Sequence, residues 1–268
     1  NYSYELWLES DTHTVGCAQW FYFGCRSYTD KDIVTHFRIA NLKKNKSLHQ
    51  EGLQPYVFSV KEQKWSCFCC FDLDYFPAKK AKADRFCLQW SYRFQAEDTV
   101  FFALFYPYTY TMLRLFLDKL KVQKQDHVIA SELCRTIAGV PHIADLTFGK
   151  KRIIFVIARQ HSGEVVGSWV MQGFMRFLLG KSLYAKVLRE KFVFHLIPMV
   201  NIDGVVHGNA RCTLAGVDPN RVWHDPNPII HPVIHQIKEY LRSLPPDSVD
   251  IFLDLHGHSA KCSAFFYG

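Results

Sequence analysis

Residues 153–164 read Ile153-Ile154-Phe155-Val156-Ile157-Ala158-Arg159-Gln160-His161-Ser162-Gly163-Glu164. The first six residues form an uninterrupted apolar run, which is typical of a buried strand. We predict that a helix follows over Val165–Leu179 and ends at Gly180. A buried strand that leads into a helix indicates an α/β domain with a parallel sheet.

The same alternation of strand and helix continues along the rest of the chain. A helix predicted over 112–121 comes first, and a strand over 192–197 follows the segment above. A helix over 232–244, stopped by Pro245-Pro246, then precedes a strand over 249–255. We therefore expect residues 109–268 to form an α/β domain with a mixed, mainly parallel sheet. Ligands of such folds collect at the carboxyl ends of the strands.

Residues 1–108 have a different pattern, with short runs of aromatic and β-branched residues separated by polar or glycine-containing breaks. This pattern predicts an antiparallel β-sandwich as an N-terminal domain over 1–108. The expected strands are 20–23, 36–40, 56–60, 86–90 and 99–103.

The composition limits the classes of function. Hydrophobic residues make up 49% of the 268 residues, enough for a sizeable core. No apolar stretch approaches the roughly 20 residues of a membrane span, so no membrane partner is expected. The net charge of +7 favours acidic partners, but no predicted helix carries the basic stripe of a nucleic-acid-binding protein. Nine irregularly spaced cysteines indicate a reducing compartment, the cytoplasm.

Two histidines and a carboxylate lie where predicted strands end. His161 and Glu164 follow the strand over 153–158, and His256 ends the strand over 249–255. Two histidines, one glutamate and a water form a catalytic zinc shell, so we predict one Zn²⁺ ion held by His161, Glu164 and His256. Asp218 is expected to accept the second N–H of a ligating imidazole and to fix its orientation.

A polar loop supplies candidate substrate-binding residues. Asn220 and Arg221 offer amide and guanidinium donors that match a carboxylate, as an exopeptidase needs for the end of its substrate. Arg211, about ten positions earlier, is a candidate to stabilise the oxyanion that forms at the scissile carbonyl.

The motifs along the chain resemble the cytosolic carboxypeptidase family of zinc carboxypeptidases, or tubulin deglutamylases. The resemblance spans nearly the whole chain. Besides His161-Ser162-Gly163-Glu164, it is carried by segments 197–205, 208–212, 216–221 and 254–259, and by Trp20-Phe21-Tyr22-Phe23 and Tyr106-Pro107-Tyr108-Thr109-Tyr110 near the start and end of the β region.

The resemblance implies the same zinc ligands, a carboxylate anchor at Asn220 and Arg221, and an oxyanion role for Arg211. It further implies removal of C-terminal glutamates from acidic tails, tubulin tails included, by a cytoplasmic protein associated with microtubules or cilia. The family's general-base glutamate lies well downstream of His256, and this chain stops twelve residues after that histidine. We expect the natural protein to continue and to supply it.

Two other functions are compatible with these residues. A zinc acyl-amino-acid amidohydrolase would use the same metal shell, although the β region and the segment Asp218-Pro219-Asn220-Arg221 argue against it. A non-catalytic protein that binds tubulin tails or microtubules would account for the charge of +7. Comparing the release of glutamate from a peptide tail with its release from an N-acyl amino acid distinguishes the carboxypeptidase from the amidohydrolase. Salt-sensitive binding of tails without turnover would indicate the non-catalytic protein.

Overall fold

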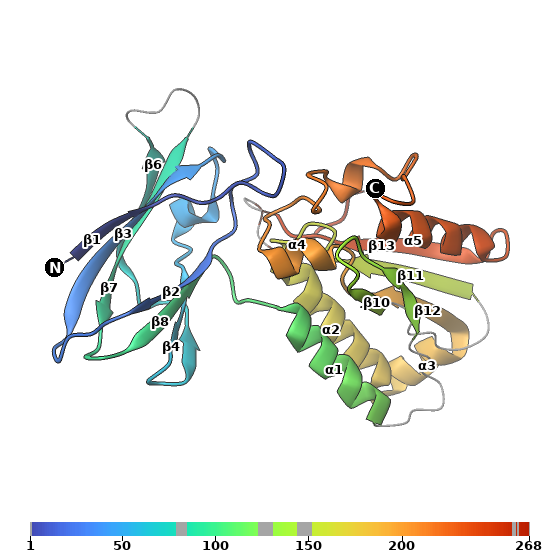
Figure 1. Ribbon diagram of the computed structural model, residues 1–268. Coiled ribbons are helices and arrows are strands. Elements are labelled where there is room, and N and C mark those ends of the chain that lie inside the picture. Colours follow the sequence, from blue (N-terminus) through green and yellow to red (C-terminus); the bar gives the residue numbers. More distant parts are fainter. Residues whose placement is uncertain are drawn as a thin grey trace. The chain divides into compact units, whose positions relative to one another are not determined.

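The computed structural model describes residues 2–78, 85–122, 131–143, 152–258, 261 and 263–267 (Figure 1). The chain forms two compact units. The first comprises 1–10, 16–107 and 258–268, and the second comprises 11–15 and 108–257. The division into folding domains at residue 108 stays a prediction.

The first unit contains two four-stranded sheets and the short 3-10 helix η1 (Leu48–Glu51). One sheet has the order β1 (Tyr2–Leu6), β3 (Ile33–Leu42), β7 (Phe86–Phe94), β6 (Phe71–Pro77). The other has the order β2 (Tyr22–Arg26), β8 (Thr99–Ala103), β4 (Tyr56–Ser59), β5 (Lys64–Ser66). The predicted antiparallel arrangement is wrong at one place, because β1 pairs with β3 in parallel. The other pairs in these two sheets are antiparallel.

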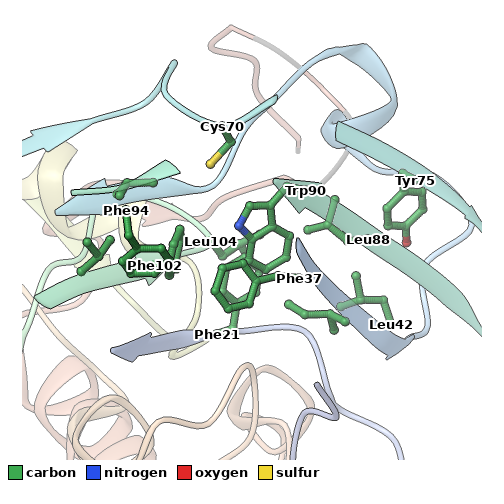
Figure 2. Packing of buried hydrophobic residues seen from close by; sticks show 13 residues of the cluster. Phe21, Phe37, Leu42, Cys70, Tyr75, Leu88, Trp90, Phe94, Phe102 and Leu104 are labelled. Atoms are coloured by element: carbon green, nitrogen blue, oxygen red, sulfur yellow. The ribbon is translucent and has the colours of Figure 1, made fainter. Parts of the chain in front are cut away.

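Aromatic side chains from both sheets form the core of this unit (Figure 2). Phe37 on β3 lies 5.4 Å from Trp90 on β7 and 5.0 Å from Phe102 on β8, measured between ring centroids. All three rings are almost fully buried. The alternating aromatic pattern of the sequence is therefore explained by one shared apolar interior.

The second unit is built on a parallel sheet with the order β12 (Phe192–Ile197), β11 (Arg152–Ala158), β13 (Val249–Leu255). The expectation of a mixed sheet is wrong for the described strands, since both pairs are parallel. An antiparallel pair, β9 (Glu132–Arg135) and β10 (Pro141–Ile143), forms a separate small sheet. The apolar run on β11 occupies the central position, which explains why it lacks alternation.

Helices cover both faces of the parallel sheet (Figure 1). α5 contributes Ile234 and Ile237 to a cluster with Phe155 of β11, and α2 contacts β11 and β13. No helix within the described ranges is both long and apolar enough to cross a membrane. The helical elements are α1 (Tyr110–Val122), α2 (Val165–Leu179), α3 (Leu183–Lys191), α4 (Ile202–His207), the 3-10 helix η2 (Pro219–Arg221) and α5 (Pro232–Ser243).

Candidate active site

The two predicted histidine ligands lie together at the carboxyl edge of the parallel sheet. His161 follows β11 and His256 follows the adjacent β13, and their ring centroids are 4.8 Å apart. Glu164 lies between them: its Oε1 is 2.8 Å from Nδ1 of His161, and its Oε2 is 3.0 Å from Nδ1 of His256. Parallel strands thus bring together residues that are more than 90 positions apart.

The donor set fits a zinc ion. One ligand atom from each of His161, Glu164 and His256 lies within 4.8 Å of the others. Imidazole nitrogen and carboxylate oxygen both bind Zn²⁺ at about 2.0–2.2 Å, and two histidines with one glutamate form a known catalytic shell. These three residues would hold the metal.

Each histidine also contacts an outer carboxylate. Nε2 of His161 is 3.1 Å from Oδ1 of Asp218, and Nε2 of His256 is 2.6 Å from Oδ2 of Asp254. An ionised carboxylate can only accept, so each ring donates from Nε2 to its aspartate and from Nδ1 to Glu164. Loss of the Nδ1 hydrogen would leave a neutral ring whose Nδ1 lone pair could bind a metal. Sequence reasoning identified Asp218 but missed Asp254, although its spacing of two residues before His256 on one strand was a usable signal.

The carboxylates alter the proton affinities of this cluster. Burial opposes a charge on His161, but hydrogen bonds to Asp218 and Glu164 outweigh it and raise its pKa. The hydrogen bonds of His256 to Asp254 and Glu164 raise its pKa to about 10. Burial works against ionisation of Glu164 and Asp218, yet hydrogen bonds with the imidazoles hold the pKa of each well below its usual range. A bound cation must therefore compete with protons.

Asp218 connects His161 to the predicted substrate loop. Its Oδ2 accepts hydrogen bonds from Nε and Nη2 of Arg211, at 2.8 and 2.7 Å. Its Oδ1 accepts from the backbone N–H of Asn220 at 2.8 Å. Arg221 is exposed and its Nη1 donates to the Asn220 carbonyl at 3.0 Å. The structure thus brings Arg211 and Asn220 beside His161, while the roles assigned to Arg211, Asn220 and Arg221 stay predictions.

Two glycines allow backbone segments to approach the predicted metal ligands closely. The Gly163 N–H donates to the Ala210 carbonyl at 2.7 Å, and a Cβ at Gly163 would lie 2.7 Å from that oxygen. At Gly167, a Cβ would lie 2.4 Å from the Leu255 carbonyl oxygen. Gly163 lies in the turn that leads into α2, and its lack of a side chain also admits the Ala210 carbonyl.

A buried arginine holds the turn between β11 and the predicted metal ligands. Arg159 is 2% exposed and adopts a positive φ of 60°. Its Nε donates to the Ser162 carbonyl at 2.8 Å, and its Nη1 donates to Oγ of Ser168 at 2.9 Å. These bonds tie the segment that carries His161 to the first turns of α2.

Asp11, from a distant part of the sequence, holds the backbone of residues 210–212. Its buried carboxylate accepts three backbone hydrogen bonds, from the N–H groups of Ala210, Arg211 and Cys212, at 2.6, 2.7 and 2.6 Å. About 200 positions separate these partners. No local pattern around Asp11 marks it for this role, so sequence reasoning had no signal for it.

The chain is similar to known carboxypeptidases. The family model described as "Zinc carboxypeptidase" matches residues 115–268. Cytosolic carboxypeptidase 6 of Mus musculus is 33% identical over all of this chain and 52% of its own length. Cytosolic carboxypeptidase 2 of Macaca fascicularis is 36% identical over all of this chain and 34% of its own length.

Solved structures share the fold. A metallo-carboxypeptidase from Burkholderia cenocepacia has a TM-score of 0.74 and 24% identity, over 95% of this chain and 65% of that one. A putative carboxypeptidase A from Shewanella denitrificans has a TM-score of 0.76 and 23% identity, over 97% and 65%. The chain spans about half or less of the length of the two curated relatives named above. It belongs to the zinc carboxypeptidases and, among them, to the cytosolic carboxypeptidase family.

Proposed function

We propose that the protein is a zinc-dependent metallocarboxypeptidase that removes C-terminal glutamates from acidic peptide tails, with polyglutamylated tubulin as the candidate substrate. The observation that carries this proposal is the convergence of His161, Glu164 and His256 at one edge of the sheet. The contact of Asp218 with both His161 and Arg211 joins the ligand set to a polar loop suited to a peptide end.

The protein's own residues divide the work between holding the metal and handling the substrate. When bound by His161, Glu164 and His256, zinc supplies Lewis acidity and lowers the pKa of a bound water to about 7. Asp218 and Asp254 hold the two imidazoles in the orientation and tautomer that ligation needs. Arg211 places positive charge beside this centre, where it can stabilise negative charge on the scissile carbonyl oxygen.

The exopeptidase specificity rests on the loop that follows Asp218. Asn220 and Arg221 would bind the terminal carboxylate of the substrate, so that only the last residue reaches the metal centre. The net charge of +7 supports an acidic substrate. The relatives named cytosolic carboxypeptidases support a cytoplasmic location, and we extend the proposal to an association with microtubules or cilia.

The test uses the full-length protein and peptides that end in several glutamates. We expect zinc in near-stoichiometric amount and release of free glutamate, with no release when the terminal carboxylate is amidated. His161→Ala and His256→Ala should lose zinc and activity, whereas His36→Ala, on β3 of the first unit, should keep both. Full zinc occupancy in either ligand variant contradicts the proposed centre. Tail binding without release identifies a binding protein, and preference for N-acyl amino acids identifies an amidohydrolase.

A further inference from the structure

A buried glutamine lies immediately before the first predicted metal ligand. Gln160 is 1% exposed, and both ends of its side-chain amide have partners. Oε1 accepts from the indole Nε1 of Trp223 at 2.9 Å, and Nε2 donates to Oδ2 of Asp254. An indole N–H can only donate and an ionised carboxylate can only accept, so the two partners fix the amide in one orientation.

Asp254 receives hydrogen bonds from this glutamine and from His256 at the same carboxylate oxygen. Its Oδ2 accepts from Gln160 and from Nε2 of His256, the latter at 2.6 Å. Its Oδ1 is buried and has no hydrogen-bond partner within the described part of the chain. Without the Gln160 amide, the bond to His256 would be the remaining constraint on the carboxylate, and the imidazole would lose its fixed support.

Trp223, which donates to Gln160, lies in the loop that carries Asn220 and Arg221. It lies two residues after Arg221, the end of η2, and its ring packs edge-on against Phe252 of β13, with centroids 6.2 Å apart. Hydrogen bonds therefore run from Trp223 through Gln160 and Asp254 to His256. This chain of contacts joins the loop that carries Asn220 and Arg221 to His256, which follows β13 and would ligate the metal.

We propose that Gln160 is a positioning residue that holds Asp254, and through it His256, in the geometry for zinc binding, and that it couples this geometry to the loop carrying Trp223. This inference rests on the proposed function, because it assigns a task within the same metal centre. Gln160 touches neither the metal nor the substrate in this assignment. Its effect must therefore appear in zinc affinity and in the environment of Trp223, in addition to turnover.

Three variants of the full-length protein test the assignment. Gln160→Met removes both amide contacts at similar volume, and Trp223→Phe removes the indole donor while keeping an aromatic ring. The matched control is Gln172→Met, since Gln172 on α2 is also buried and accepts from the hydroxyl of Tyr108 at 2.8 Å. Competition with a zinc chelator should show about tenfold weaker zinc binding for Gln160→Met, at the low end of outer-contact losses. A smaller loss is expected for Trp223→Phe, and none for the control.

A second readout follows the hydrogen-bond chain directly. The indole N–H resonance of Trp223, identified by its absence in Trp223→Phe, should shift when Zn²⁺ is added to the metal-free protein. In Gln160→Met this shift should disappear. Wild-type zinc affinity in a folded Gln160→Met, or an indole resonance that zinc does not move, overturns the inference and leaves the proposed function intact. Failure of the wild-type protein to bind zinc overturns both.

Discussion

Replacement of Gly167 by alanine tests whether the start of α2 fixes the position of His256, a predicted metal ligand. The added Cβ would lie 2.4 Å from the Leu255 carbonyl oxygen, and real Cβ atoms do not approach closer than 3.0 Å, so 3.0 − 2.4 gives a shift of at least 0.6 Å. The obstructing atom is backbone and cannot rotate away. Since Leu255 is bonded to His256, the shift reaches the imidazole, where a tolerance of about 0.5 Å applies to a functional site.

The expected size of the effect follows from two opposed terms. Alanine is favoured over glycine inside a helix by about 0.8–1.0 kcal/mol. Overpacking costs about 1–3 kcal/mol, so the free energy of unfolding should fall by up to about 2 kcal/mol. Zinc affinity should fall by about tenfold or more, as it does when ligand support is disturbed. Gly173 provides the control, because it is exposed on the same helix and its added Cβ would meet no atom within 4 Å.

Two measurements on each variant complete the test. Urea denaturation of the metal-free proteins gives the free energy of unfolding, and chelator competition gives the zinc affinity. Gly173→Ala should be stabilised by about 1 kcal/mol with unchanged zinc binding. If Gly167→Ala matches Gly173→Ala in both quantities, the contact between α2 and β13 does not position His256, and the reasoning is refuted.

Three further predictions concern the charged groups of the site. Asp218→Asn weakens the contact with Arg211 and should reduce zinc affinity by about 10–100-fold in chelator competition; unchanged affinity would exclude support of His161 by Asp218. Asp11→Asn replaces an accepting oxygen by a donor and should lower the free energy of unfolding by about 1–3 kcal/mol in urea denaturation. It should also reduce kcat but keep the zinc content; a loss of zinc would contradict a role limited to holding the backbone of residues 210–212. The raised pKa of His256, about 10 against 6.5, stabilises the metal-free protein fully below pH 6.5, and this contribution is lost as the pH rises through 10. The urea midpoint of the metal-free protein should therefore fall over that range while zinc affinity rises, and a flat midpoint would contradict it.

The part of the fold that local pattern determines could be predicted from the sequence. The helix predicted over 165–179 and the strands over 192–197 and 249–255 have the predicted bounds. The helix predicted over 112–121 begins two residues earlier, at Tyr110. α3 was not predicted; it starts after Ser182, whose hydroxyl accepts from the Ala185 N–H at 3.2 Å, a capping signal that was present in the sequence.

Features that depend on distant partners could not be predicted in the same way. The parallel pairing of β1 with β3 depends on contacts between segments about 33 positions apart, and Tyr2–Leu6 carries no mark of strand direction. The three backbone bonds accepted by Asp11 and the amide bond from Gln160 to Asp254 also join remote segments. The convergence of His161, Glu164 and His256 was predictable, because the carboxyl ends of parallel strands meet at one edge of the sheet. Their role as metal ligands stays a prediction.

The charges around the proposed ligand set favour a divalent over a monovalent ion. Glu164 lies between two imidazoles, and each imidazole has a second carboxylate, Asp218 or Asp254, at its Nε2. Such closely spaced carboxylates repel one another unless positive charge lies between them. Two protonated imidazoles supply two positive charges, and a zinc ion bound by two neutral imidazoles supplies the same number. Exchange of two protons for one dication therefore leaves the charge of the site unchanged, whereas exchange for a monovalent cation would lower it by one unit.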